Sequence, residues 1–152
     1  MPRKPRPGHS LGETNLDLSA QWHPSLNGAL TPFDVTPGSH EIVWWKCPKG
    51  EDHEWRAPVK DRSAGRGCAI CAGKKVVRSN CLSTLNPQLA AEWHPTMNGS
   101  LHPDDVTAGS NKKVWWKCPK GDDHEWQAII SDRNRGDGCG VCRNLVVVRS
   151  NC

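Results

Sequence analysis

Two copies of one cysteine and histidine pattern constrain this chain more than any other feature. In the first copy, the run V-W-W-K-C-P-K-G-E-D-H-E-W (43–55) is followed by twelve further residues and then by C-A-I-C (68–71). The second copy, 114–142, comes 71 residues later with the same spacing. Each copy offers Cys-x5-His, fourteen intervening residues and Cys-x2-Cys. Four thiolate and imidazole ligands at such spacings predict one zinc ion per copy, hence two per chain.

Each predicted zinc site has one imidazole and three thiolates. The ligands are Cys47, His53, Cys68, Cys71, Cys118, His124, Cys139 and Cys142. When the protein supplies all four ligands, water has no coordination position, so the pattern favours structural over catalytic zinc. Two disulfides per copy are less favoured, because the sequence has no N-terminal apolar run of the secretory type and a reducing cytosol preserves thiolates.

Comparison of the two copies also shows which of the remaining histidines occur in both. His40 and His102 align with Asn and Thr in the other copy, so neither is a shared ligand. His23 and His94 do repeat, but each lies between a Trp and a Pro at the expected end of a helix. We therefore assign His23 and His94 a structural role.

One alternative ligand set uses the cysteine that closes each repeat. Cys81, repeated as Cys152, could replace His53 in an all-cysteine site. Nine residues separate Cys81 from Cys71, so the chain would have to fold back to bring it there. We favour His53 and interpret Cys81 and Cys152 as free thiols.

The duplication sets the predicted domain organisation. Residues 11–81 align with residues 82–152 without a gap, with 41 identical positions of 71. Residues 1–10, rich in Pro and basic side chains, are expected to form a disordered tail. Repeats of about 70 residues rarely bury enough apolar surface alone, so metal is the expected staple.

The net charge of +4 lies mainly in the tail. Residues 1–10 carry three basic side chains, whereas the repeats have nine Lys and Arg against eight Asp and Glu, and eight against eight. A dedicated duplex-DNA binder usually has a stronger positive footprint. No apolar stretch of membrane-spanning length occurs, and we expect a cytoplasmic protein.

The turn and periodicity signals predict a small, metal-stabilised α+β unit. A short helix is expected over 85–93, because Asn86 can cap it and Pro87 suits its first position, with a less well-marked counterpart over 15–22. A β-hairpin should follow, and its loop should carry the Cys-x5-His pair. Its two strands are expected over 43–46 and 53–59, and a further short strand should close the units at 76–78 and 146–149. In the loop, Gly50 is expected to permit an unusual backbone angle.

These motifs carry a resemblance to a known family. The run W-H-P-x-x-N-G-x-L-x-P-x-D-V-T-x-G-S, followed by V-W-W-K-C-P-K-G, H-E-W and C-x-x-C, resembles the probable zinc-ribbon family with treble-clef character, over residues 11–152. The resemblance implies tandem zinc-ribbon/treble-clef units, the eight ligands named above and an association with nucleic-acid enzymes such as restriction-type endonucleases. Members commonly have Cys-Pro-x-Gly-His, whereas Glu51-Asp52 and Asp122-Asp123 lengthen that loop here.

Repeated tryptophans and cations are the candidates for ligand contact. All eight Trp repeat, and they can either stack on nucleic-acid bases or form the core; we favour the core, since Trp buries a large area. Neighbours on a strand point to opposite faces, so one of Trp44 and Trp45 should either be exposed or pack on the helix that contains Trp22. The repeated cations that could contact phosphates are Lys46, Lys49, Arg62, Arg78, Lys117, Lys120, Arg133 and Arg149.

The sequence therefore predicts a non-enzymatic tandem zinc-finger protein that binds nucleic acid, DNA over RNA, and is nucleoid-associated if DNA is the ligand. The alternative is a protein–protein adaptor, possibly accessory to a nucleic-acid-processing enzyme. A nuclease of the His-Asn-His type shares treble-clef architecture. It needs a catalytic histidine and an open metal position, and the sequence offers neither.

Overall fold

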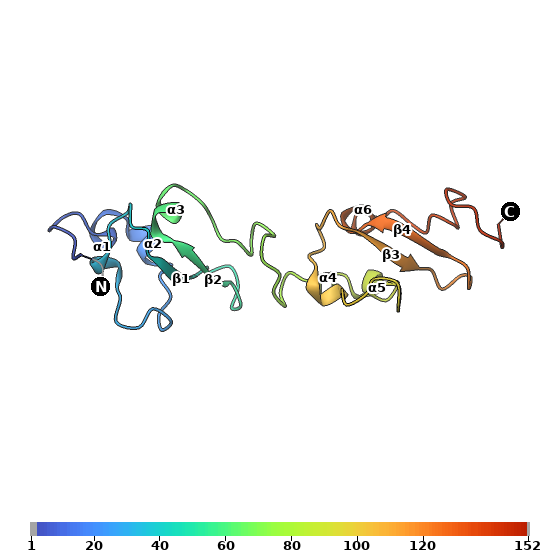
Figure 1. Cartoon of the computed structure of the whole chain (residues 1–152), viewed down its shortest axis with the longest axis horizontal. Helices are drawn as coiled ribbons and strands as arrows, with labels where there is room; N and C mark the ends of the chain where they lie inside the picture. Colours follow the sequence, from blue (N-terminus) through green and yellow to red (C-terminus); the bar gives the residue numbers. More distant parts are fainter. Residues whose placement is uncertain (1–2, 152) are drawn as a thin grey trace. The chain divides into compact units, whose positions relative to one another are not determined.

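The computed structural model describes residues 3–151, which form two compact units of the same design (Figure 1). Contacts between residues assign the chain up to Lys75 to the first unit and the chain from Val76 to the second. The repeat boundaries at 11–81 and 82–152 stay predictions. Among the described residues, every helix is too short or too polar to span a membrane.

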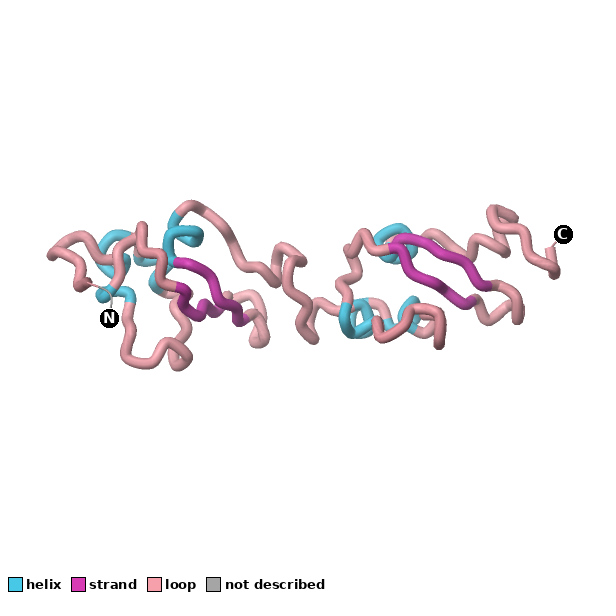
Figure 2. The backbone as a smooth tube through the Cα atoms, in the orientation of Figure 1, coloured by secondary structure: helices cyan, strands magenta, loops and turns pink. Residues whose placement is uncertain are grey.

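Each unit contains short helices and one two-stranded antiparallel sheet, and much of the remaining chain is loop (Figure 2). The first unit has α1 (Leu11–Thr14), α2 (Leu16–Ser19), the 3-10 helix η1 (Pro32–Asp34), β1 (Ile42–Lys46), β2 (Glu54–Pro58) and α3 (Val59–Ser63). The second has α4 (Leu82–Leu85), α5 (Pro87–Ala90), η2 (Pro103–Asp105), β3 (Lys113–Lys117), β4 (Glu125–Ile129) and α6 (Ile130–Asn134). The predicted small α+β architecture is confirmed.

The predicted hairpin is present in both units. In β1 and β2, Trp45 pairs with Trp55 and Trp44 pairs with Arg56. Alternation along β1 buries Val43 and Trp45 and turns Trp44 toward the outer face, where it is half-buried. The same register and burial pattern recur in β3 and β4.

The outer edge of β1 is closed by the W-H-P segment. The Asn27 side chain accepts from the Trp44 backbone N–H (2.7 Å) and donates to its carbonyl (2.9 Å). The backbone N–H of His23 donates to the same carbonyl. Trp22 forms an isolated bridge with Trp45, and their rings meet edge to face at 5.5 Å. These bonds explain the asparagine after W-H-P, because Asn98 makes the same pair of bonds with Trp115 in the second repeat.

The predicted helices are present but shorter than expected. Asn86 accepts from the N–H of Leu89, and Pro87 occupies the first turn, so α5 begins where the sequence indicates. The helix ends at Ala90 rather than Trp93. The preceding helices α1 and α4, and the helices α3 and α6 after each hairpin, were not predicted, because segments of four or five residues show no helical periodicity.

The predicted closing strands are wrong. Residues 76–78 and 146–149 contain no strand, and each copy instead leads into a turn. In the second unit, the N–H of Asn151 donates to the Val148 carbonyl, and the Asn151 side chain accepts from the Val148 N–H (2.8 Å). A local side-chain bond of this kind competes with strand pairing even where valines favour it.

One hydrophobic core per unit lies between the helices and the hairpin. Trp45 and Trp116 are fully buried, and Trp55 and Trp126 nearly so. The other four tryptophans are half-buried. The buried residues of the second unit are Leu82, Leu89, Val106, Ala108, Val114, Trp116, Cys118, Trp126, Ile130, Cys139 and Val141. Zinc ligands are therefore part of the core, as expected for a small metal-stapled unit.

Candidate metal centre

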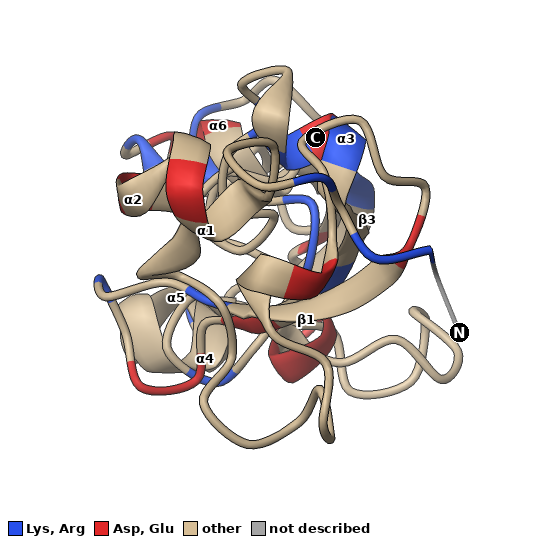
Figure 3. Ribbon diagram, turned by 90° about the vertical axis from the view of Figure 1, so that its left-hand side faces the viewer, with Lys and Arg blue, Asp and Glu red and all other residues tan. Residues whose placement is uncertain are grey.

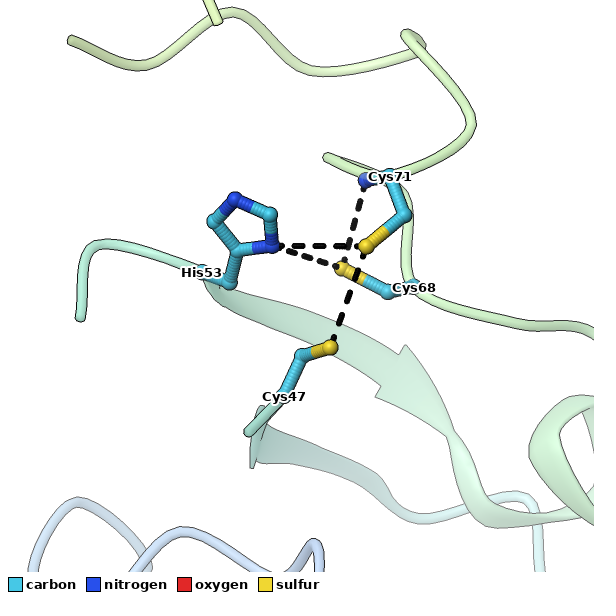
Figure 4. Close-up of side chains that lie close together, drawn as sticks. All are labelled: Cys47, His53, Cys68 and Cys71. Atoms are coloured by element: carbon cyan, nitrogen blue, oxygen red, sulfur yellow. Dashed lines mark hydrogen bonds between the residues drawn. The ribbon is translucent and has the colours of Figure 1, made fainter. Parts of the chain in front are cut away.

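The hairpin and the turn after α3 bring four ligands to one point. Cys47 directly follows β1 and His53 directly precedes β2, so the pairing of the two strands fixes the distance between these two ligands. A turn at Gly65, which has a left-handed φ of 101°, leads the chain from α3 back to Cys68 and Cys71. In Figure 4 the side chains of all four ligands point toward a common centre.

The distances fit a tetrahedral zinc ion. Zn–S bonds of about 2.3 Å and Zn–N bonds of about 2.0 Å require sulfurs about 3.8 Å apart and sulfur–nitrogen separations of about 3.5 Å. The sulfurs of Cys47 and Cys71 are 3.8 Å apart, and the Nδ1 atom of His53 lies 3.8 Å and 3.4 Å from the sulfurs of Cys68 and Cys71. A disulfide would need about 2.05 Å, so these cysteines are unbridged.

The second site repeats this geometry. The sulfurs of Cys118 and Cys142 are 3.8 Å apart, and the Nδ1 atom of His124 lies 3.9 Å and 3.4 Å from those of Cys139 and Cys142. In both groups all four ligand atoms lie within 4.8 Å of one another. Each Cys3His site can hold one metal ion, which agrees with two zinc ions per chain.

The electrostatics of the thiols also favour a cation. Desolvation, reinforced by the sulfurs of Cys68 and Cys47, raises the pKa of Cys71 to about 11. Desolvation would raise the pKa of Cys47 too, but the backbone N–H of Lys49 and the neighbouring thiols lower it overall. Three thiolates so close together repel one another until a dication neutralises them. Zinc binding therefore displaces protons from this site.

The glycine of each Cys-Pro-Lys-Gly loop is needed for space. A Cβ atom on Gly50 would lie 2.4 Å from the His53 ring, and one on Gly121 would lie 2.5 Å from the His124 ring. Neither glycine has a positive φ. The expectation that Gly50 supplies an unusual backbone angle is therefore wrong: the imidazole ligand packs directly over the loop.

Arg62 and Arg133 are buried beside the sites, which corrects their predicted role as phosphate contacts. The Arg62 guanidinium lies 5.2 Å and 5.0 Å from the ring centroids of Trp45 and Trp55. It also donates to Gln21 and to the Arg66 carbonyl. Only 7% of Arg62 and 6% of Arg133 is exposed, too little to reach a phosphate. Three thiolates and one zinc ion leave one net negative charge, and the charges of Cys68 and Cys47 oppose the desolvation that lowers the pKa of Arg62, so this guanidinium balances the first metal site.

The repeated histidines outside the ligand set have the predicted structural position. The Nδ1 atom of His23 accepts from the backbone N–H groups of Ser25 and Leu26, and its Nε2 atom lies 3.2 Å from Glu54. His94 makes the equivalent contacts. Both are buried and lie outside the groups that can hold a metal.

Cys81 lies in a different place from the metal ligands. It is buried, directly precedes α4, and bridges to Thr107 in the second unit. Its sulfur lies 3.3 Å from both the Arg78 carbonyl and the Thr84 hydroxyl. The group that can hold a metal in the first unit contains His53, and Cys81 is not part of it.

The other predicted phosphate contacts differ in exposure. Lys46 donates to the Glu54 carboxylate (2.8 Å) and to the Glu51 carbonyl, and Lys117 makes the same contacts in the second unit. The other four predicted contacts are exposed: Lys49, Arg78, Lys120 and Arg149. Figure 3 shows Lys and Arg interspersed with Asp and Glu along the ribbon. The exposed positive charge is therefore interspersed with negative charge along the chain.

Two four-ligand metal sites, each at the end of a β-hairpin, define a tandem zinc-binding protein. The family model of the probable treble clef zinc finger domain matches the chain twice, over residues 18–74 and 89–145. The chain belongs to this family, which confirms the treble-clef fold suggested by the sequence. No curated protein matches the chain.

Proposed function

We propose that this chain is a non-enzymatic zinc-finger protein of the cytoplasm that binds nucleic acid, with DNA preferred over RNA, and is associated with the nucleoid. In each unit the protein fills all four coordination positions, so a bound zinc ion has no site left for water or substrate. The metal serves to fix the loops that surround it.

One observation carries the proposal: exposed, repeated cations lie on turns next to the metal. Lys49 and Lys120 lie two residues after the first cysteine ligand of their sites and are exposed. A turn fixed by zinc holds such a side chain at low entropic cost, which suits contact with a phosphate. Arg78 and Arg149 add a second exposed pair at the turns near the repeat ends.

Binding of labelled duplex DNA, measured by fluorescence polarisation at two salt concentrations, tests this proposal. The affinity should fall steeply with salt, with a logarithmic slope of about −0.9 for each phosphate contacted. Lys49→Ala combined with Lys120→Ala should reduce that slope by about 1 to 2. Lys60→Ala, which removes an exposed lysine that is serine in the second repeat, is the control. Absence of binding at low salt would refute the proposal.

One observation favours the adaptor function as a second candidate. Leu145 and Val147 of the second unit are 70% and 76% exposed, and the half-buried Val146 lies between them. Exposed apolar side chains that are close together often mark a protein contact. A protein partner whose capture requires Leu145 and Val147, with no DNA affinity at either salt concentration, would establish this alternative.

A further inference from the structure

A groove in the first unit lies between the end of α2 and the loop that carries the first zinc ligand. Its walls include the half-buried Trp22 and two exposed prolines, Pro24 and Pro48. The groove has a volume of about 860 Å³, within the usual range of ligand-binding clefts, and most of its lining is apolar. The second unit has an equivalent groove at the repeated Trp93. We call the groove of the first unit the Trp22 groove.

The charged side chains of the Trp22 groove leave an excess of negative charge. Two exposed carboxylates, Asp17 and Glu51, line it together with one exposed lysine, Lys49. Lys46 lines it as well, but the Glu54 carboxylate at 2.8 Å compensates its charge. The groove therefore combines apolar walls with one uncompensated negative charge.

The groove of the second unit lacks this excess. Gln88 lies where the first groove has Asp17. Glu92, the one carboxylate among the described residues that line the second groove, pairs with Arg133 at 2.8 Å. The lysine that lines it is paired with a glutamate, as in the first unit. The apolar walls are thus common to both grooves, whereas the negative charge belongs to the first.

The N-terminal segment of the chain has the complementary chemistry. Residues 2–7, with the sequence P-R-K-P-R-P, combine three prolines with three cations. The three cations, Arg3, Lys4 and Arg6, are exposed, and residues 3–7 contain no helix or strand. Proline restricts the backbone in advance, so such a segment loses little entropy when it docks in an aromatic-lined groove.

The segment lies elsewhere on its own unit. The backbone N–H of Gly8 donates to the Glu13 carboxylate (3.1 Å). Hydrogen bonds from Thr31 and, to a smaller extent, the charge of Lys4 lower the pKa of Asp34. Neither Glu13 nor Asp34 is among the described residues that line the Trp22 groove. These contacts place the segment outside the groove of its own chain, so the groove is open to the segment of another copy.

We infer that the Trp22 groove binds residues 2–7 of a second copy of this chain and that the groove of the second unit does not. The prolines pack against the apolar walls, and the cations lie against Asp17 and Glu51. Nucleic acid is a less suitable occupant, because these two carboxylates repel its phosphates. The inference concerns a contact between proteins and does not rest on the proposed nucleic-acid binding.

A labelled peptide of residues 1–9, titrated with the full-length protein in fluorescence polarisation, tests the inference. Ala20 lines the groove and is exposed, so a larger side chain there carries little risk to folding. Ala20→Arg should weaken peptide binding at least about tenfold, because it fills the groove and repels the cations of the peptide. Ala91→Arg makes the same change in the second groove and should leave the affinity unchanged. Asp17→Gln, which copies the second groove, should weaken binding a few-fold and reduce its dependence on salt.

Sedimentation velocity of the full chain tests the contact between copies. The wild-type protein should associate as its concentration rises to about 1 mM, Ala20→Arg should not, and Ala91→Arg should behave as wild type. Zinc content and circular dichroism of each variant confirm that the units remain folded.

The inference is wrong if the peptide does not bind, if the wild-type protein stays monomeric over this range, or if Ala20→Arg and Ala91→Arg behave alike. A labelled oligothymidine that displaces the peptide, and that Ala20→Arg binds more tightly than wild type, would assign the groove to nucleic acid and also overturn it. Duplex DNA binding by the same variants tests the proposed function separately.

Discussion

The two units have the same metal-site geometry, but the surroundings of the site differ. In the first unit, Arg62 donates to the neutral side chain of Gln21, whereas in the second Arg133 pairs with the Glu92 carboxylate at 2.8 Å. The second site therefore has an extra negative charge nearby. Between the two repeats, the residue that partners the buried arginine and residues on the outer face of the hairpin differ, while the metal ligands and the tryptophans are identical. The residues that are identical in both units are therefore those that the metal site requires. The residues that differ are those through which the two units can differ in binding.

A second difference lies at the first helix of each unit. Ser10 and Glu13 form a capping box at α1, with the Ser10 hydroxyl donating to Glu13 at 2.6 Å. At α4 the same positions hold Cys81 and Thr84, and no side-chain cap bond to the backbone is present. The first unit therefore has the better-stabilised entry into its helices.

Loss of one ligand should have the largest effect and should test whether the units are independent. Cys68→Ser should remove one zinc ion and unfold the first unit, since structural zinc contributes about 10–16 kcal/mol in small fingers at pH 7. Cys139→Ser should do the same to the second unit. Zinc analysis together with amide exchange resolves which unit opens. Opening of both units in either variant would contradict their separate stability.

Removal of the buried arginines should come next. Arg62→Ala and Arg133→Ala should each destabilise their unit by about 3 kcal/mol, because a balancing charge and its stacking on two rings are lost. The loss should be larger for Arg133→Ala, which leaves Glu92 without its partner. Thermal unfolding followed by Trp fluorescence measures both, and Arg66→Ala, at an exposed position, is the control. Equal, small losses would show that these arginines are surface residues in solution.

Smaller losses should follow from adding a methyl group to the ligand loop. Gly50→Ala and Gly121→Ala should each cost about 1–3 kcal/mol and weaken zinc retention in competition with a chelator, because the new Cβ would meet the imidazole ligand. Gly38→Ala has open space around it and should be nearly neutral. A neutral Gly50→Ala would mean that His53 does not lie over the loop.

The smallest expected effect is a gain. Cys81→Ser with Thr84→Glu copies the α1 capping box onto α4 and should stabilise the second unit by about 0.5–1 kcal/mol. Hydrogen bonds from Ser10 lower the pKa of Glu13, so its stabilisation is present above the ordinary glutamate pKa and is lost as pH falls below it. The transplanted cap should show the same pH dependence in thermal unfolding. A gain that persists in acid would point to another cause.

The sequence predicted the features that repetition and strand alternation determine. The spacing of Cys47, His53 and the Cys-x2-Cys pair identified the residues that the structure brings together, and V-W-W-K identified the hairpin. It could not predict that Arg62 is buried, because an arginine on a five-residue helix looks exposed until the tryptophans that cover it are placed. The close contact between Gly50 and the His53 ring could not be predicted either, because it depends on where the metal site places that ring.

Mass spectrometry of the intact protein, compared under native and denaturing conditions, would show whether each unit holds one structural zinc ion. We expect a native mass heavier by two zinc ions, both lost together with the Trp fluorescence signature of the folded state when a chelator strips the metal. Fewer than two zinc ions in fully folded protein, or an unchanged fluorescence spectrum after complete metal loss, would contradict it.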